Sequence, residues 1–170
     1  RGLFRPLPEG TVLDDVLVPM RVAAQGYRVI FEPRAIAWDQ PSHRPDQERR
    51  RKIRTLAGNY QLIQLAPWLA SPAGNPLWFR FASHKLLRLL APWMMVSMTL
   101  ASAALSTRHP MYALTFGGIV AAMLMVGLAL LAPSLGRRFP LRIALAFFYL
   151  NLFAAQALLA FARNRRLHLW

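Results

Sequence analysis

The chain contains no cysteine and almost no negative charge beyond its first third. Without cysteine, disulfides and thiolate metal sites are excluded. All seven Asp and Glu residues lie at or before Glu48, and the 122 residues that follow contain none. Any chemistry that depends on a carboxylate must therefore come from the first 48 residues.

Positive charge is distributed in the opposite way. Of the 21 Lys and Arg residues, 15 follow Glu48, whereas the first 48 residues hold six basic and seven acidic side chains. The later basic residues cluster beside long apolar runs rather than among exposed aromatics. This pattern is typical of contact with anionic lipid headgroups and not of nucleic-acid binding. We therefore expect anionic membrane lipid as a partner, and no nucleic acid.

Three apolar runs in the basic part are candidate transmembrane helices. They cover residues 89–105, 111–132 and 143–162, which is 17, 22 and 20 residues. About 20 apolar residues cross a bilayer, so the first run is at the short limit. Asn151 and Gln156 lie inside the third run, where ordinary interhelical hydrogen bonding would satisfy them.

The basic residues beside these runs predict an orientation. Arg80, Lys85 and Arg88 precede the first run, whereas the loop after it has only Arg108. By the positive-inside rule the N-terminal part lies in the cytoplasm. Three full crossings would then place the basic cluster that begins at Arg163 outside. Either the third run does not cross fully, or the charge bias is overridden there.

The segment before residue 46 predicts one helix and one or two strands. Asp14 and Asp15 open a helix over 16–24, where a carboxylate could cap the free backbone N–H groups. Pro19 fits this helix only in or just after its first turn. Gly26 ends it, and residues 27–31 and 35–38 read as extended pieces.

A basic amphipathic helix is predicted from about residue 46 to residue 66. Ile53, Leu56, Tyr60 and Ile63 form an apolar stripe at helical spacing, and arginines project from the other faces. A helix of this kind could lie at the membrane surface.

The order of these features resembles a known family. An acidic pair, Asp14 and Asp15, is followed by the segment 26–35, a basic stretch over 49–58, and membrane spans. This order resembles the C-terminal half of processive-type family 2 glycosyltransferases, the membrane-bound relatives of cellulose and hyaluronan synthases. The opening residues 1–4, Arg-Gly-Leu-Phe, also resemble the segment that precedes the acidic pair in that family. The resemblance covers essentially the whole chain.

The resemblance implies a role for the acidic pair. In that family its second member is the general base, which here would be Asp15, with Asp14 in support. An acceptor hydroxyl is a poor nucleophile until its proton is removed, so a carboxylate within hydrogen-bond reach fits this chemistry. The alternative is that the pair only caps a helix.

Many of these synthases also carry a Gln-x-x-Arg-Trp motif with a Gly shortly after it. Counting back from Gly58, the arginine falls on Arg54, the Gln position on Arg51 and the Trp position on Thr55. Only the arginine is kept, so stacking of an acceptor sugar and processive polymerisation are not implied. Arg54 and Arg51 would bind the acceptor or a diphosphate, because a guanidinium matches phosphate oxygens. The alternative is a charge cluster at the membrane surface over residues 49–54.

The resemblance also implies a division of the chain. Residues 1–48 would be the end of an α/β catalytic domain of the GT-A type, 49–82 a basic interfacial helix and linker, and 83–170 a membrane region with two to three transmembrane helices. The chain itself would be mainly α. We expect the rest of the catalytic domain upstream, which would leave residues 3–38 loosely packed and this chain alone inactive.

Mg²⁺ or Mn²⁺ would also be bound by that upstream part. No Asp-x-Asp and no Gly-rich phosphate loop occurs in the 170 residues. The four histidines are scattered without ligand spacing, so no metal site is predicted within the chain.

We therefore expect an inverting glycosyltransferase anchored in an inner (plasma) membrane, with its catalytic part in the cytoplasm. It would move a sugar from a nucleotide-sugar donor to a lipid-linked or polysaccharide acceptor. The alternative from a different class is a non-catalytic membrane module that binds anionic lipid or a partner protein.

Overall fold

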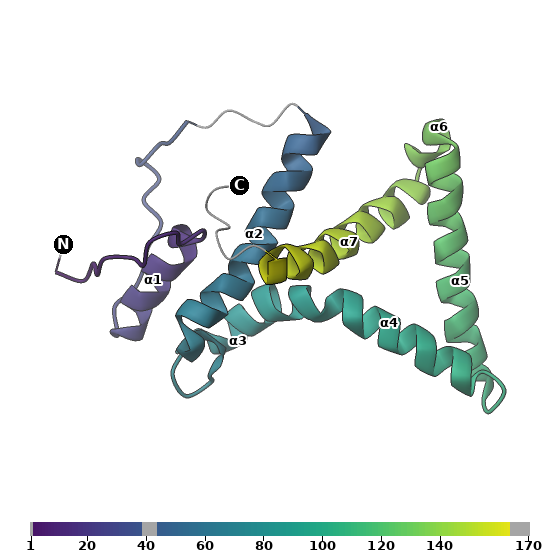
Figure 1. The fold of residues 1–170 in the computed structure, drawn as a ribbon, viewed down its shortest axis with the longest axis horizontal. Helices are drawn as coiled ribbons and strands as arrows, with labels where there is room; N and C mark the ends of the chain where they lie inside the picture. Colours follow the sequence, from purple (N-terminus) through teal and green to yellow (C-terminus); the bar gives the residue numbers. More distant parts are fainter. Residues whose placement is uncertain (1, 39–43, 164–170) are drawn as a thin grey trace. The chain divides into compact units, whose positions relative to one another are not determined.

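The computed structural model describes residues 2–38 and 44–163, apart from the side chains of Pro133 and Leu135 (Figure 1). Within these residues every regular element is a helix, so the prediction of a mainly α chain is confirmed. The elements are α1 (Asp14–Ala24), α2 (Pro45–Leu65), the 3₁₀-helix η1 (Pro67–Ala70), α3 (Trp78–Phe81), the π-helix η2 (Ala82–Leu86), α4 (Leu87–Leu105), α5 (Pro110–Leu131), α6 (Pro133–Gly136) and α7 (Leu141–Arg163).

The chain forms two compact units. One is built from residues 1–89 together with residues 156–170, and the other from residues 90–155. The first unit therefore contains α1, α2 and the end of α7, and it is the unit in which all the proposed site residues lie. The three-part division at residues 48 and 82 stays a prediction.

Helix α1 begins two residues earlier than expected. Leu13 is the N-cap and makes no side-chain cap hydrogen bond, so Asp14 and Asp15 are the first two helical residues rather than capping residues. Their negative charges still interact favourably with the positive end of the helix dipole, which lies at the N-terminus of α1. Pro19 is the sixth residue of the helix, just after its first turn, as expected, and its missing N–H leaves the carbonyl of Asp15 without the usual helical donor.

Gly26 ends α1 as predicted. Its φ of 85° lies in the left-handed region, which glycine adopts without a steric penalty. The Gly26 N–H donates to the carbonyl of Ala23 and the Tyr27 N–H donates to that of Val22, so two carbonyls of the last turn are satisfied.

The strand predicted over Tyr27–Phe31 and the second extended piece, Ala35–Trp38, are wrong for the described chain. No strand is present there, and both segments are exposed, with Phe31 at 88%. A strand needs a neighbouring strand to bond its backbone groups, and the described residues offer none. High β-propensity alone therefore leaves this stretch irregular.

A small apolar core holds α1 to α2 and to the loop that follows. Leu17, Leu62 and Leu69 are fully buried, and the cluster is completed by Leu13 and Phe81 together with Ala66. The expectation that residues 3–38 are loosely packed is therefore wrong for α1 and fits only the stretch after it. The packing surface comes from α2, not from a sheet.

Helix α2 matches its predicted range within a residue, but it is more enclosed than one apolar stripe suggests. Four consecutive residues, Leu56, Ala57, Gly58 and Asn59, are buried, so the middle of the helix is covered on more than one side. Its basic residues Arg51 and Arg54 are exposed, as expected.

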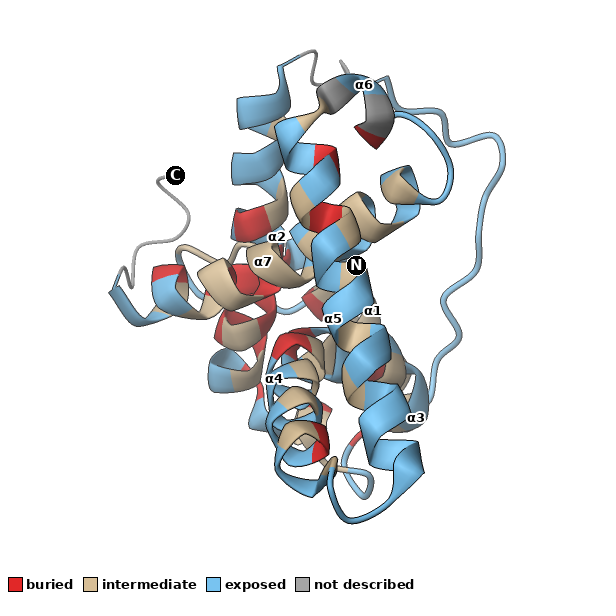
Figure 2. Ribbon diagram, turned by 90° about the vertical axis from the view of Figure 1, so that its right-hand side faces the viewer, coloured by how far each residue is buried: buried red, intermediate tan, exposed pale blue. Residues whose placement is uncertain are grey.

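Three described helices are long and apolar enough to cross a membrane: Trp78–Leu105, Pro110–Leu131 and Leu141–Arg163. The first is longer than the 17-residue run because α3, η2 and α4 continue one another, so length no longer limits a crossing. Most of α5 is coloured as exposed in Figure 2. Such self-bonded apolar helices identify a membrane protein.

The two polar residues in the third run differ in their partners. The Asn151 amide donates to the carbonyl of Phe147 on its own helix, so interhelical bonding is not needed there. Gln156 Oε1 accepts from Arg49 Nη2 of α2 at 3.3 Å, as interhelical bonding predicts. In the same region Tyr60 stacks on Phe161 with ring centroids 5.6 Å apart.

Candidate functional site

The acidic pair is positioned by a close contact between the chain before α1 and helix α2. Gly58 lies against Val12 and Leu13: a β-carbon at Gly58 would be 2.9 Å from Leu13 Cγ and 3.1 Å from Val12 Cγ1. Only glycine allows this approach without displacing the neighbours. The glycine that follows the predicted arginine motif therefore sets the distance between the acidic pair and α2.

Gln61, one turn further along α2, holds the same segment through two hydrogen bonds. Its Oε1 accepts from the Val12 N–H at 2.9 Å, and its Nε2 donates to the Gly10 carbonyl at 2.9 Å. Both hydrogen bonds are partly buried, which reduces competition from water. The backbone that leads into Asp14 is thus fixed to α2 at both Gly10 and Val12.

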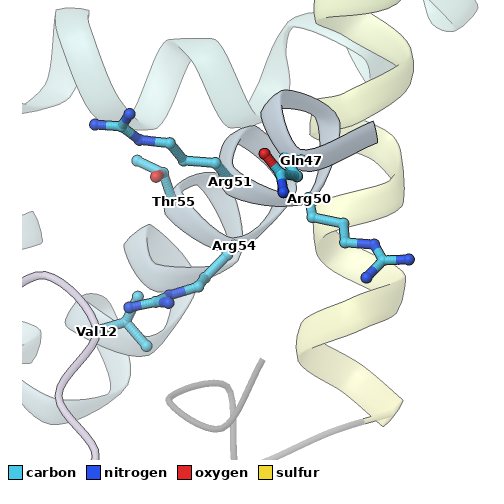
Figure 3. Close-up of a pocket in the computed structure, with 6 residues that line it drawn as sticks. All are labelled: Val12, Gln47, Arg50, Arg51, Arg54 and Thr55. Carbon is cyan, nitrogen blue, oxygen red and sulfur yellow. The ribbon is translucent and has the colours of Figure 1, made fainter. Parts of the chain in front are cut away.

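An open pocket of about 700 Å³ lies beside this junction. It is lined by Val12 and by Gln47, Arg50, Arg51, Arg54 and Thr55 of α2. Figure 3 shows the Arg54 side chain reaching toward Val12, whereas Arg50 and Arg51 leave the helix in other directions. The volume is within the range of about 300–1,000 Å³ that is usual for small-molecule sites.

The lining of this pocket is strongly cationic. Three of its six lining residues are arginines and none is a carboxylate. Planar guanidinium groups bind phosphate and carboxylate oxygens through paired hydrogen bonds. The pocket is therefore suited to an anion, and both Arg51 and Arg54, which were predicted from the sequence, contribute to it.

Asp14 and Asp15 lie next to the pocket rather than in its wall. Both are exposed, and neither side chain forms a hydrogen bond or ion pair with the described residues. Val12 lines the pocket and Asp14 is two residues further on, so their backbones are at most about 7 Å apart. The structure thus brings Val12, which precedes the acidic pair by two residues, to the arginine-lined pocket, although Val12 and Arg54 lie about 40 positions apart in the sequence.

A metal ion of the kind that the resemblance implies would need oxygen ligands. Among the residues that the structure covers, no group of three or more His, Cys, Asp or Glu side chains could hold one. Asp14 and Asp15 are adjacent in sequence and supply two carboxylates without a third ligand.

Sequence reasoning missed Val12, Gln61 and Gly10 as positioning residues. Their contacts join positions 49 to 51 residues apart, and nothing in the local pattern indicates such a pairing. A weak signal was present, because Gln61 is a polar residue on the helix face that carries Leu62 and Gly58 toward the core.

The fold and site define a membrane-embedded helical protein with an acidic pair beside an arginine-lined pocket. The family model described as glycosyl transferase family group 2 matches residues 4–160. The chain therefore belongs to the family 2 glycosyltransferases, as its sequence predicted. Membership implies, in general terms, a nucleotide-sugar donor and an acceptor. Searches of curated proteins and of solved structures returned no significant match.

Proposed function

We propose that this protein is an inverting glycosyltransferase that transfers a sugar from a nucleotide-sugar donor to a lipid-linked or polysaccharide acceptor at the membrane. The observation that carries the proposal is the double attachment of residues 10–13 to α2. Through Gly58 and Gln61, this attachment fixes the segment that leads into the acidic pair on α2, the helix that carries the arginines of the pocket. The family match supports glycosyl transfer as the reaction type.

In the proposed mechanism Asp15 is the general base. Its carboxylate removes the proton of an acceptor hydroxyl, and the hydroxyl oxygen forms a bond to the anomeric carbon of the donor sugar. The bond from that carbon to the diphosphate oxygen breaks on the opposite face, and the nucleoside diphosphate leaves with the electron pair. Only one carboxylate is needed, because a single displacement inverts the anomeric carbon.

Arg54, together with Arg51, is the proposed binding group for the diphosphate or the acceptor. Negative charge grows on the departing diphosphate, and fixed cations stabilise it without reorganising during the reaction. Arg54 is the better placed of the two, because its side chain extends toward the segment that carries the acidic pair (Figure 3). Asp14 would support Asp15 by keeping negative charge at this end of the pocket.

Four further assignments come only from the resemblance to the membrane-bound family 2 synthases. They are a GT-A-type catalytic domain that ends in residues 1–48, Mg²⁺ or Mn²⁺ as cofactor, an inner-membrane location and a cytoplasmic catalytic part. The described residues hold no ligand cluster for the metal. On the resemblance alone, we propose that this chain does not itself bind the metal and is inactive by itself.

The test is Asp15→Asn in the native-length protein, assayed in membranes by the release of nucleoside diphosphate from a panel of nucleotide sugars. Loss of a general base should lower the rate about 10²- to 10⁴-fold, while nucleotide-sugar binding is retained. Asp14→Asn should have a milder effect.

Glu9→Gln is the matched control, because it removes one exposed carboxylate that precedes the segment held by α2. It should leave turnover close to that of the wild type. Near-normal turnover in Asp15→Asn would show that Asp15 is not the base. Absence of transfer for every donor, with normal membrane association, would favour the non-catalytic membrane module.

A further inference from the structure

The C-terminal end of α7 packs on α2, within the unit formed by residues 1–89 and 156–170 (Figure 1). Gln156 Oε1 accepts a hydrogen bond from Arg49 Nη2 at 3.3 Å, and further along α7 the ring of Phe161 stacks on Tyr60 with centroids 5.6 Å apart. Ala157, between these two contacts, is fully buried. Both contacts involve α2, so residues 156–161 of α7 lie at the level of that helix.

Helix α2 is too charged in its first part to enter the hydrocarbon of a membrane. Seven of its nine residues from position 46 to position 54 carry a charge: Asp46, Glu48, Arg49, Arg50, Arg51, Lys52 and Arg54. Each charge would cost about 3 kcal/mol or more at the centre of a bilayer. Helix α2 therefore stays on one side of the membrane, and Gln156, which is bonded to Arg49, stays on that side with it.

The start of the first apolar helix is attached to the same unit. Phe81 is only 5% exposed and belongs to the core that Leu17 of α1 and Leu62 of α2 share. This residue lies in the continuous helical stretch Trp78–Leu105, so the stretch begins on the side of the membrane on which α2 lies.

These attachments determine how often the chain crosses the membrane. Residues 90–155 leave the first unit through α4 and return to it through α7. A chain that leaves one side of a membrane and returns to the same side crosses it an even number of times. Of the three apolar helices in the described part of the chain, one therefore does not cross.

Length indicates that α7 is this helix. Between Arg142 and the Arg49-bonded Gln156 lie residues 143–155, 13 residues that extend for about 20 Å as an α-helix. The hydrocarbon core is about 30 Å thick, and apolar segments this short more often lie at the interface. Helix α5 has 22 residues without a charge, and residues 89–105 of α4 have 17, which is sufficient for a crossing.

The distribution of basic residues favours the same assignment. If α4 and α5 cross, only Arg108 lies on the far side, and Arg137, Arg138, Arg142 and Arg163 all remain on the side of α2. Any other pair of crossing helices would move Arg137 and Arg138 to the far side, and three crossings would move Arg163 there. Basic residues of short loops collect on one side of a membrane, so the first arrangement agrees best with this rule.

We propose that α4 and α5 form a transmembrane hairpin, and that α7 does not cross but lies at the membrane surface and docks on α2 with its C-terminal end. An interfacial position also suits Asn151 and Gln156, which are polar groups within an otherwise apolar helix. Helix α2 is then held at the membrane by α7 as well as by the helix that carries Phe81. The proposal is independent of glycosyl transfer, because it uses neither the acidic pair nor the pocket of Figure 3.

Labelling of single cysteines tests this topology, since the full chain contains no cysteine of its own. Four exposed residues are replaced one at a time: Ala24→Cys in α1, Thr107→Cys after α4, Ser134→Cys in α6 and Ala162→Cys near the end of α7. Each variant is treated with a membrane-impermeant maleimide in right-side-out and in inside-out vesicles. Ala24→Cys, Ser134→Cys and Ala162→Cys should react in the same type of vesicle, and Thr107→Cys only in the other.

Every other labelling pattern contradicts the proposal. Reaction of Ala162→Cys together with Thr107→Cys would show three crossings. Reaction of Ser134→Cys with Thr107→Cys, or of Ser134→Cys alone in the second type of vesicle, would show that α7 crosses. Reaction of all four in one type of vesicle would show that no hairpin crosses. An Ala162→Cys variant that reacts in neither type would place the end of α7 inside the hydrocarbon.

A cross-link tests the docking of α7 on α2 separately. Tyr60→Cys combined with Phe161→Cys should be bridged by a short bis-maleimide, because the two native rings are stacked. The matched control combines Tyr60→Cys with Thr107→Cys, which lie on opposite sides of the membrane in the proposed topology and should not be bridged. Mass spectrometry of the digested chain detects the bridged peptides. Absence of the bridge in the first pair, or equal bridging in both pairs, would overturn the proposal.

Discussion

Two parts of the chain expose apolar side chains, and they differ in how their backbones are satisfied. In residues 27–38, Phe31 and Trp38 are 88% and 94% exposed, and the backbone belongs to no helix or strand. Along α5, Leu114 and Leu124 are 73% and 64% exposed, but the backbone is helical throughout. A helix completes its own hydrogen bonds and then needs only lipid around it, whereas an extended segment needs a second strand.

The difference shows why only part of the region before α2 is ordered by packing. Helix α1 satisfies its own backbone and offers Leu13 and Leu17 to α2, so it joins the core. The stretch after Gly26 has equally apolar side chains but no partner surface among the described residues. The acidic pair thus lies on the part that is packed, which is the part able to hold a catalytic group in place.

The largest expected effect tests this contrast directly. Leu62→Ala removes a fully buried side chain from the α1–α2 core and should lower the free energy of unfolding by about 2–5 kcal/mol. Phe31→Ala, in the exposed stretch, should change it by no more than about 0.5 kcal/mol. Chemical unfolding in detergent micelles measures both. A comparable loss for Phe31→Ala would mean that residues 27–38 pack on a surface of their own.

Arg54→Lys tests whether an anion binds in the pocket beside the contact between α2 and residues 10–13. The charge is conserved, but a lysine cannot make the paired contact of a guanidinium, so transfer should fall about 10- to 100-fold, as expected for one charge-assisted hydrogen bond. Activity in the native-length protein is measured beside liposome flotation. An equal loss in flotation would assign Arg54 to lipid binding and support the charge-cluster alternative for residues 49–54.

Gly58→Ala should have a smaller effect on stability, with a sign that depends on the close contact. An added methyl group would clash with Leu13 and Val12 and cost about 1–3 kcal/mol, offset by about 1 kcal/mol from the better helix propensity of alanine. Gly117→Ala in α5 is the matched control, because nothing lies within 4 Å of its added β-carbon. It should be neutral or stabilising. A Gly58→Ala protein as stable as the control would show that the contact is not tight.

The helices were predictable because each is encoded by a local pattern. The basic helix and the second and third spans were predicted within a few residues of their observed bounds, whereas the first span begins eleven residues earlier, at Trp78. The arginines were predicted through the motif that ends at Gly58. The strand at Tyr27–Phe31 was wrong because β-propensity says nothing about whether a partner strand exists. The hydrogen bonds of Gln61 were not foreseeable, because contacts between residues far apart in the chain produce no periodic pattern in the sequence.

The smallest expected effect concerns local order within the exposed stretch. Glu32 Oε1 accepts from Arg34 Nε at 2.9 Å and from the Arg34 backbone N–H at 3.1 Å. The side-chain contact with Arg34, and then the backbone bond, hold the pKa of Glu32 below its usual value of 4.5. Because the pKa is lowered, the stabilisation is present at neutral pH and is lost as the pH falls through the pKa of the folded state.

Carboxyl NMR titration of Glu32 checks this. Arg34→Gln should move the midpoint up toward the usual value, and high salt should act in the same direction, since both groups are exposed and screened. Arg28→Gln, a loss of charge elsewhere in the stretch, should leave the midpoint in place. An unchanged midpoint in Arg34→Gln would mean that the contact between Glu32 and Arg34 does not persist in solution. Residues 27–38 would then lack even local order, which would widen their contrast with α5.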